Sequence, residues 1–421
     1  MKELIVAIVL ISITALVFLF FRKSTKEEEK PREKVKKEKK KESLQQEKSV
    51  PIVHSNAVDL KEHLIKTFKD SKDLRRCYVF HNGHIILFSD DKRISLCYLR
   101  KLNDKTQKII SKSVDLDLIS DISYSEKAKM IAVTLKNSKN ILFYDLEEEN
   151  GKNKLVKTEK QIPTKRKFEI KYVAITKDGS HVSTSGTDQD TEVQVYNTKT
   201  MKMVEKIETG GIYNLQMKMS PDDKDILIST FLNDISVIHF DKKDKFNDQT
   251  RTYEAVVSVS RQKSISGIKE KILCFEFSND DRFFIVSCES KMIKILQNFG
   301  NISESKVFIE FKPDFKSEVS SLFVDSFFNG KIDGYIALVD ERDIVICDAE
   351  GKEIKRLEKA HDDEIICLKL VKVDLSSESQ ETNENLKEIT FEDPKDKDGS
   401  IALISASKDG RVKIWNLKLN K

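Results

Sequence analysis

The chain has 421 residues, of which 39% are hydrophobic and 34% are charged, with only 13 Gly and 6 Pro. This length accommodates one large β domain or two ordinary domains, and the low Gly and Pro content excludes collagen-like and Gly-rich disordered proteins. The net charge is +4, but residues 22–48 hold 12 Lys/Arg and 7 Glu, so the rest of the chain carries a net charge of −1. Net charge therefore argues against a main body that binds polyanions.

Residues 4–21 contain no charged side chain and only two polar ones, Ser12 and Thr14. The run is just long enough, as a helix, to cross a thin bilayer, and it predicts one N-terminal transmembrane helix, the anchor of residues 1–21. A cleaved signal peptide is the alternative. The run is long for the apolar region of a signal peptide, however, and it ends in Phe20 and Phe21, directly before Arg22, without the small residues of a cleavage site.

Charges around this segment predict its orientation. Lys2 is nearly alone before it, whereas 12 Lys/Arg follow it directly, so the body of the chain should face the cytosol. One feature is relevant to the opposite orientation. Asn301-Ile302-Ser303 is an acceptor sequence for N-glycosylation, which would matter if this segment were lumenal.

Residues 22–60 form a charged linker after the anchor. Its candidate contacts with an anionic surface or with RNA are Lys36, Lys37, Lys39, Lys40 and Lys41. The tract is either disordered or a solvated helix with Glu/Lys pairs, and a spacer is the simplest interpretation. Binding to anionic lipid head groups is the first alternative. Contact with RNA or ribosomes is the second, although no aromatic side chain is interleaved for base stacking.

From about residue 74, short alternating apolar runs are separated by turns, so residues 61–421 are predicted to form one all-β domain. Its clearest unit is a hairpin in residues 401–417, with a turn at Lys408, Asp409 and Gly410. Six earlier hairpins repeat the three apolar positions of Val412, Ile414 and Trp415. These positions are Ile94, Leu96, Cys97; Ile141, Phe143, Tyr144; Val193, Val195, Tyr196; Ile235, Val237, Ile238; Ile293, Ile295, Leu296; and Ile344, Ile346, Cys347.

Successive hairpins are separated by 42 to 68 residues. Units of about 40 to 45 residues with four short strands are typical of β-propeller blades, and longer spacings indicate loop insertions. Seven units predict a seven-bladed propeller, in which an N-terminal strand near residues 64–68 completes the last sheet. The insertion at about 374–398 carries nine Asp/Glu and three Lys, which predicts a disordered acidic loop that could serve as a docking arm for a basic partner.

Six cysteines lie singly in these apolar runs, and none belongs to a CxxC pair. They are Cys77, Cys97, Cys274, Cys288, Cys347 and Cys367. The pattern favours buried free thiols over disulfides, which suits a reducing compartment.

The last hairpin resembles WD-repeat (WD40) proteins. Their structural tetrad joins a histidine, a serine or threonine, an aspartate and a tryptophan by hydrogen bonds within one blade. The matching residues here are His361, Ser405, Asp409 and Trp415. The usual Gly-His is Ala360-His361 in this chain, and the usual Trp-Asp is Trp415-Asn416. The resemblance implies a WD40-type propeller that acts as a protein-binding scaffold, and only the last blade has the full tetrad.

An anchor, a basic tract and a degenerate propeller, in this order, are also similar to WD-repeat proteins of the endoplasmic reticulum membrane. This narrower resemblance implies a single-pass scaffold with a cytosolic propeller and a role in stress signalling and translation control through a membrane-bound kinase. It also implies contact with RNA or ribosomes. The expected partners are proteins that bind the propeller faces, and neither a cofactor nor a small-molecule substrate is expected.

No enzymatic activity is predicted, because the sequence lacks a Gly-rich phosphate loop, a nucleophile elbow and an HExxH motif. His81 and His84 flank a tight turn without a nearby carboxylate or thiol, and a turn explains them better than a metal site. Two other classes of protein stay open. One is a lumenal, calcium-dependent lactonase or esterase propeller with an N-terminal anchor. The other is a nucleotide-exchange propeller of the secretory pathway, which is disfavoured because its tether is C-terminal.

Overall fold

Most of the predicted β domain is defined in the computed structural model. It describes residues 64–69, 74–80, 85–90, 92–98, 110–114, 118–149, 152–186, 190–210, 213–247, 252–265, 267–278, 282–298, 301–317, 324–328, 334–374, 390–391, 400–417 and 419. The predicted anchor, the basic tract with its five lysines, the turn at 81–84 and most of the acidic insertion lie outside these residues. Within the described ranges, no helix is long and apolar enough to cross a bilayer.

The described residues form seven antiparallel sheets, here called blades 1 to 7 in chain order. Blade 1 contains β2 (Arg76–Phe80), β3 (Ile85–Ser89), β4 (Arg93–Tyr98) and β5 (Ile110–Ser113). Blade 2 contains β6 (Ile119–Ser125), β7 (Met130–Leu135), β8 (Asn140–Glu149) and β9 (Lys152–Pro163). Blade 3 contains β10 (Ile170–Ile175), β11 (His181–Gly186), β12 (Glu192–Asn197) and β13 (Lys202–Glu208). All three have the strand order of the chain.

The next three blades repeat this order. Blade 4 contains β14 (Asn214–Met219), β15 (Asp225–Thr230), β16 (Ile235–Asn247) and β17 (Thr252–Arg261). Blade 5 contains β18 (Ile272–Phe277), β19 (Phe283–Cys288), β20 (Ile293–Gln297) and β21 (Lys306–Phe311), with the short 3₁₀ helix η2 (Ile302–Glu304) before β21. Blade 6 contains β22 (Val324–Phe328), β23 (Gly334–Asp340), β24 (Asp343–Asp348) and β25 (Glu353–Leu357).

Blade 7 combines the two ends of the described chain. It contains β26 (Ile365–Asp374), β28 (Ser400–Ser407) and β29 (Arg411–Asn416), and β1 (Leu64–Lys69) is its outermost strand. Leu64 lies opposite Trp415 in the β1–β29 pair. The predicted closing strand near residues 64–68 therefore forms as expected. The sequence predicts that the acidic insertion is a disordered loop. Two of its residues instead form a strand, β27 (Thr390–Phe391), which pairs with the end of β26.

The repeated hairpins are the second and third strands of every blade, and the apolar triplets predicted from the sequence lie on the third strands. Alternating apolar residues suit a strand because successive side chains point to opposite faces. The second strands β7, β11, β15 and β19 are buried on both faces along their whole length. The outer strand β21 instead alternates between half-buried and exposed positions. Burial on both faces requires a neighbouring sheet on each side.

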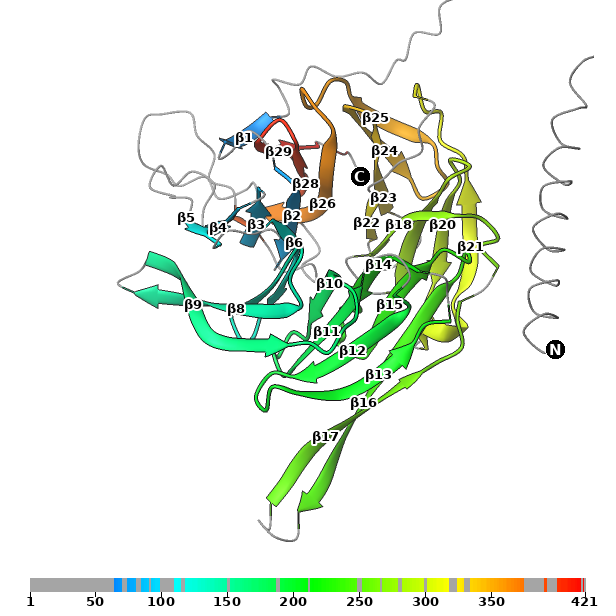
Figure 1. Cartoon of the computed structure of the whole chain (residues 1–421). Coiled ribbons are helices and arrows are strands. Elements are labelled where there is room, and N and C mark those ends of the chain that lie inside the picture. Colours follow the sequence, from blue (N-terminus) through cyan, green and yellow to red (C-terminus); the bar gives the residue numbers. More distant parts are fainter. Residues whose placement is uncertain are drawn as a thin grey trace, which may run out of the picture. The chain divides into compact units, whose positions relative to one another are not determined.

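Seven clusters of buried apolar side chains lie between successive blades. One of them joins blade 7 to blade 1 and includes Cys77 and Val412, so the row of blades closes into a ring. The first strands of neighbouring blades contact one another all the way round, and Figure 1 shows them towards the middle. The all-β prediction is confirmed, and the ring is a β-propeller. Five of the six cysteines are buried and Cys367 is half-buried.

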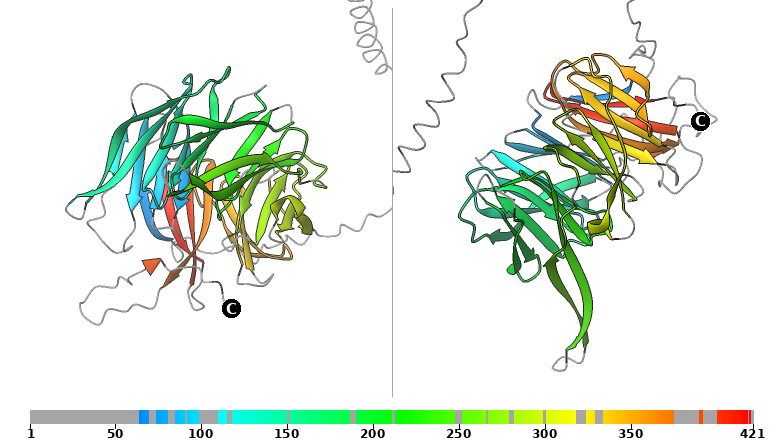
Figure 2. Two further views of the ribbon diagram at one scale, coloured as in Figure 1. Left: turned by 90° about the horizontal axis from the view of Figure 1, so that it is seen from below. Right: turned by 90° about the vertical axis from the view of Figure 1, so that its right-hand side faces the viewer.

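Strand direction gives the ring two distinct ends. Loops that enter the first strand of a blade lie at the same end as the turns between its second and third strands, and we call this the entry end. The other connections lie at the return end. The β16–β17 hairpin is longer than the rest of its blade and extends away from the neighbouring blades at the return end (Figure 2).

Candidate functional site

The four residues of the predicted tetrad come from four places in blade 7. His361 lies in the loop before β26, Ser405 on β28, Asp409 in the turn after β28, and Trp415 on β29. His361 Nδ1 is 3.0 Å from Asp409 Oδ2, and His361 Nε2 is 2.8 Å from Ser405 Oγ. Trp415 Nε1 donates to the same Ser405 oxygen at 2.8 Å. The four side chains therefore form one continuous chain of hydrogen bonds.

The environment of His361 and Asp409 determines the protonation states of these two side chains. Burial lowers the pKa of His361 despite the opposing effect of Asp409, so the imidazole is neutral at pH 7. Burial disfavours the charge on Asp409, but hydrogen bonds from His361 and from the backbone N–H groups of Asp362 and Arg411 lower its pKa to about 2. The neutral imidazole then donates a hydrogen bond from Nδ1 to Asp409 and accepts a hydrogen bond at Nε2 from the Ser405 hydroxyl. Each donor has one acceptor.

Serine, histidine and aspartate in this order also occur in hydrolase triads, but this serine is not placed for attack on a substrate. Ser405 and His361 are 0% and 1% exposed. The Ser405 oxygen also accepts the Trp415 N–H, and its own proton is directed to His361 Nε2, so both of its hydrogen-bonding roles are filled within the blade. The arrangement therefore fixes the geometry of the blade and has no open position for chemistry.

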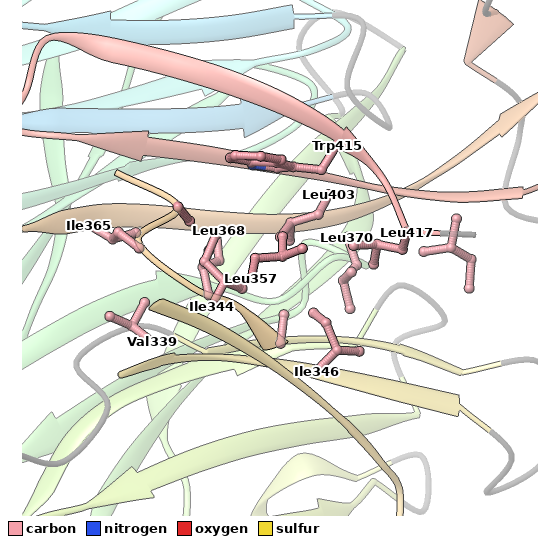
Figure 3. Close-up of a cluster of buried hydrophobic side chains, with 13 residues drawn as sticks. Val339, Ile344, Ile346, Leu357, Ile365, Leu368, Leu370, Leu403, Trp415 and Leu417 are labelled. Atoms are coloured by element: carbon pink, nitrogen blue, oxygen red, sulfur yellow. The ribbon is translucent and has the colours of Figure 1, made fainter. Parts of the chain in front are cut away.

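Trp415 also belongs to the apolar cluster between blades 6 and 7. It is 0% exposed, and its indole packs with Leu368, Leu403 and other aliphatic side chains of both blades (Figure 3). Lys413 Nζ lies 5.4 Å from the ring centroid, a cation–π contact on the edge of the cluster. Trp415 thus takes part in the hydrogen bonds of the tetrad, in the apolar cluster and in the pairing with β1.

Comparison with known families locates a match in this same blade. Residues 395–416 match the family described as WD domain, G-beta repeat. The last hairpin thus matches a WD repeat in sequence. WD repeats in general form non-enzymatic scaffolds for protein–protein interactions, and this blade has that repeat within a ring of seven. A comparison with curated proteins finds no match to the chain.

A quartet of charged residues lies on the first strands of blades 4 to 7, and sequence reasoning missed it. Lys218, Glu276, Asp325 and Lys369 occupy corresponding positions, opposite the middle of each second strand. Lys218 pairs with Glu276, and Lys369 Nζ lies 3.0 Å from Asp325 Oδ1. Because these strands surround the axis of the ring, the pairs join neighbouring blades there.

Burial and the neighbouring charges set the protonation of this quartet. Burial raises the pKa of Asp325 to about 6, although Lys369 lowers it. The pKa of Glu276 is lowered instead, because Lys218 and Lys369 together outweigh the effect of burial. Burial disfavours the charge on Lys369, but Asp325 and Glu276 raise its pKa. The negative charges of Glu276 and Asp325 are thus balanced by the two lysine ammonium groups beside them.

A second polar group crosses the boundaries of blades 1 to 3. Tyr78 on β2 donates its hydroxyl to Asp121 on β6, and Asp121 Oδ2 accepts the backbone N–H of Val173 on β10 at 2.9 Å. Burial raises the pKa of Asp121 despite the nearby Arg76. No three His, Cys, Asp or Glu side chains among the described residues are grouped so that they could hold a metal ion. Asp121, Glu276 and Asp325 each accept hydrogen bonds from lysine, tyrosine or backbone donors.

The loop that enters blade 3 is held by a buried ion pair. Arg166 Nη1 lies 2.7 Å from Asp190 Oδ2, and both side chains are almost inaccessible to solvent, at 0% and 4% exposure. Arg166 also donates to Thr184 Oγ1 at 3.1 Å and to the carbonyl of Glu192 at 3.0 Å. Gly186 makes this approach possible, since a Cβ there would lie 2.0 Å from Asp190 Oδ2.

We expect Gly186→Ala to displace Asp190 and to loosen the loop of residues 164–169. The cost should be about 1 to 3 kcal/mol, as for other overpacked sites, and it should appear as a lower midpoint in chemical denaturation. Faster hydrogen exchange should be confined largely to blade 3. Lys202→Ala, at an exposed position of β13, serves as the control and should change stability by less than about 0.5 kcal/mol. An unchanged midpoint for Gly186→Ala would show that Asp190 does not need this space.

Proposed function

We propose that this chain is a non-enzymatic, membrane-tethered WD-repeat scaffold whose propeller binds protein partners. The observation that carries the proposal is the WD repeat at residues 395–416, in the blade that closes the ring with β1. Its histidine, serine and aspartate are buried and saturated by hydrogen bonds, so they support a stable platform rather than a reaction.

The tether is proposed from the sequence outside the described residues. An uncharged run at 4–21 followed by a basic tract supports a single-pass anchor with the propeller on the cytosolic side. The same order of segments supports the endoplasmic reticulum as the membrane and a role in stress signalling and translation control. In that arrangement, and in the order of short segments such as residues 219–222, 277–282 and 186–196, the chain is similar to transducin β-like protein two.

The basic tract is proposed to contact anionic lipids, RNA or ribosomes through Lys36, Lys37, Lys39, Lys40 and Lys41. Changing these five lysines to Gln in the full chain separates the possibilities. Loss of co-sedimentation with ribosomes, with binding to phosphatidylserine vesicles retained, would assign the tract to RNA or ribosomes. The reverse result would assign it to lipid. Retention of both would make the tract a spacer.

A calcium-dependent lactonase or esterase is the main alternative from another class. Such an enzyme needs carboxylates free to converge on a cation near the axis. Glu276 and Asp325 are instead paired with Lys218 and Lys369, and each lysine would compete with a divalent cation for its carboxylate. This pairing favours the scaffold.

Membrane topology distinguishes the scaffold from a lumenal propeller, and Asn301 reports it. Asn301 is exposed, at the N-terminus of η2 in blade 5. We expect no glycan on Asn301 of the full chain in cells, because a cytosolic propeller never meets the lumenal transferase. As a control, a cleavable secretory signal in place of residues 1–21 should direct the propeller to the lumen and give a glycan at Asn301. An endoglycosidase-sensitive form of the unaltered chain would contradict the cytosolic orientation.

A further inference from the structure

Exposed apolar side chains gather at the entry end of blades 2, 3 and 4. Seven large apolar residues are exposed among the described residues, and four of these, Leu118, Phe168, Phe231 and Leu232, lie at that end. The other three, Leu64, Met203 and Phe308, lie singly on outermost strands of three different blades. Single exposed apolar residues are ordinary, whereas a group on one face usually marks an interaction surface.

Leu118 and Phe168 belong to neighbouring loops that enter the first strands of blades 2 and 3. These strands run side by side, because Ser120 Oγ on β6 donates to the carbonyl of Ile170 on β10 at 2.8 Å. Leu118 precedes Ser120 by two residues, and Phe168 precedes Ile170 by two. The two exposed side chains therefore start from adjacent positions. They are 37% exposed each.

The Phe168 loop is held rigidly in its exposed position. Arg166 is buried in its ion pair with Asp190, so its neighbours Lys165, Lys167 and Phe168 are directed to solvent. A loop fixed by a buried charge pair loses little additional conformational entropy on binding. This rigidity favours a preformed surface over a chance exposure.

Blade 4 displays its apolar pair on a hydrogen-bonded turn. The Phe231 ring lies against the Tyr213 ring at a centroid distance of 4.7 Å, and the Phe231 N–H donates to the Tyr213 carbonyl at 3.1 Å. Thr230 Oγ1 bonds the side chain of Asp234 across the turn and accepts the Leu232 N–H at 3.3 Å. Leu232, at the tip, is 54% exposed.

Four exposed lysines accompany these apolar residues: Lys136, Lys139, Lys165 and Lys167. Their loops are in contact, since the Lys136 N–H donates to the Leu118 carbonyl at 2.7 Å and the Thr164 N–H donates to the Lys139 carbonyl at 2.9 Å. None of the four lysines has an ion pair with another residue in the described ranges. Cations that have no ion pair within the described ranges, beside exposed Leu and Phe, make a surface complementary to acidic, apolar side chains.

We propose that Leu118, Phe168, Phe231, Leu232 and these four lysines, together the entry-end patch, bind an acidic segment of a partner protein that carries bulky apolar side chains. The inference rests on the proposed scaffold function and assigns the surface and the chemistry of the partner. Two of the four apolar residues are leucines, which cannot stack on bases, and Tyr213 already packs on Phe231. Arg166, the arginine in the Phe168 loop, is buried. A protein segment therefore fits better than RNA.

The test measures binding of a fluorescein-labelled amphipathic peptide of Glu, Asp, Leu and Phe to the full chain by fluorescence anisotropy. We expect saturable binding that weakens with salt. Peptides with Gln in place of the acids, or Ser in place of Leu and Phe, should each bind at least about tenfold more weakly. The first loses the ionic contacts with the lysines, and the second loses the apolar contacts. The charge reversal Lys165→Glu with Lys167→Glu should have a similar effect, and so should Phe168→Ser.

Blade 3 also supplies matched controls. Lys199→Glu with Lys202→Glu makes the same charge change on exposed lysines at the return end, and Met203→Ser removes an exposed apolar side chain from β13. Both should bind the peptide within about twofold of the parent. Binding that is unchanged in the patch variants, or lost equally in the controls, would overturn the inference. Tighter binding of labelled poly(U) than of the peptide would replace it with a nucleic-acid surface.

Failure of this inference can be told apart from failure of the scaffold function. The full chain and the Lys165→Glu, Lys167→Glu, Phe168→Ser variant are compared by proximity labelling in cells. Loss of a reproducible set of labelled proteins in the variant supports the patch. The same set in both would leave the scaffold standing and overturn the patch. No reproducible set for the parent chain would overturn both.

Discussion

Trp415→Ala should destabilise the propeller by about 3 to 5 kcal/mol, as large-to-small changes of buried aromatic residues do. The side chain is fully buried between blades 6 and 7 and donates to Ser405 Oγ, so the change removes packing and leaves the Ser405–His361 chain incomplete. Such a loss is a large fraction of the stability of an ordinary domain. Chemical denaturation, followed by circular dichroism, measures it.

This variant should also loosen the closure of the ring. Because Trp415 lies opposite Leu64, the amides of β1 should exchange hydrogen faster in Trp415→Ala than in the parent. Trp415→Phe is the matched control, since it keeps most of the packing but loses the indole N–H and part of the ring, and it should cost less than half as much. A Trp415→Ala protein that melts like the parent would show that this residue does not close the ring.

Lys369→Met should cost about 3 to 5 kcal/mol at pH 8, because it leaves Asp325 buried without its ammonium partner. The Asp325 side chain is 0% exposed, and Glu276 beside it retains only Lys218. The change removes the cation that lowers the pKa of Asp325, so this pKa should rise above about 6. Stability is measured by denaturation in a series of buffers from pH 8 to pH 5.

The pH dependence has a definite sign. Asp325 has a higher pKa in the folded chain than in the unfolded chain, where it is about 3.9, so the folded state binds more protons and gains stability as the pH falls through the folded value. Lys369→Met should therefore recover part of its lost stability between pH 8 and pH 5. Lys271→Met, at an exposed pair with Glu289, is the control and should cost less than about 1 kcal/mol at every pH. A loss that does not depend on pH would contradict the assigned role of Asp325.

Features encoded by local alternation could be predicted from the sequence. All seven hairpins lie where the apolar triplets indicate, and β1 completes blade 7. A strand can be predicted from alternating apolar residues without knowledge of the tertiary structure, and a turn such as Asp409-Gly410 sets the pairing register of the two strands that it joins. The four tetrad residues could be named because their spacing resembles a known repeat, and they lie within hydrogen-bonding distance in the described blade.

Features that depend on ring closure could not be predicted. Lys218 and Lys369 look like ordinary polar residues on the solvent side of an amphipathic strand. They reach Glu276 and Asp325 only because the first strands of all blades converge on one axis. The Arg166–Asp190 pair likewise joins a loop to a turn 24 residues later. Leu118 and Phe168 resemble core residues in the sequence, and only the structure distinguishes them as exposed.

β1 closes residues 64–417 into one propeller, and a disulfide cross-link between β1 and β29 tests this closure most directly. Thr67 lies opposite Lys413 in the β1–β29 pair, and paired positions in an antiparallel sheet bring Cβ atoms to about 5 Å. Thr67→Cys with Lys413→Cys should cross-link on mild oxidation and migrate faster on a non-reducing denaturing gel. Thr67→Cys with Lys199→Cys, on a different blade, should not. Absence of the cross-link in the first pair, or equal cross-linking in both, would contradict the closed ring.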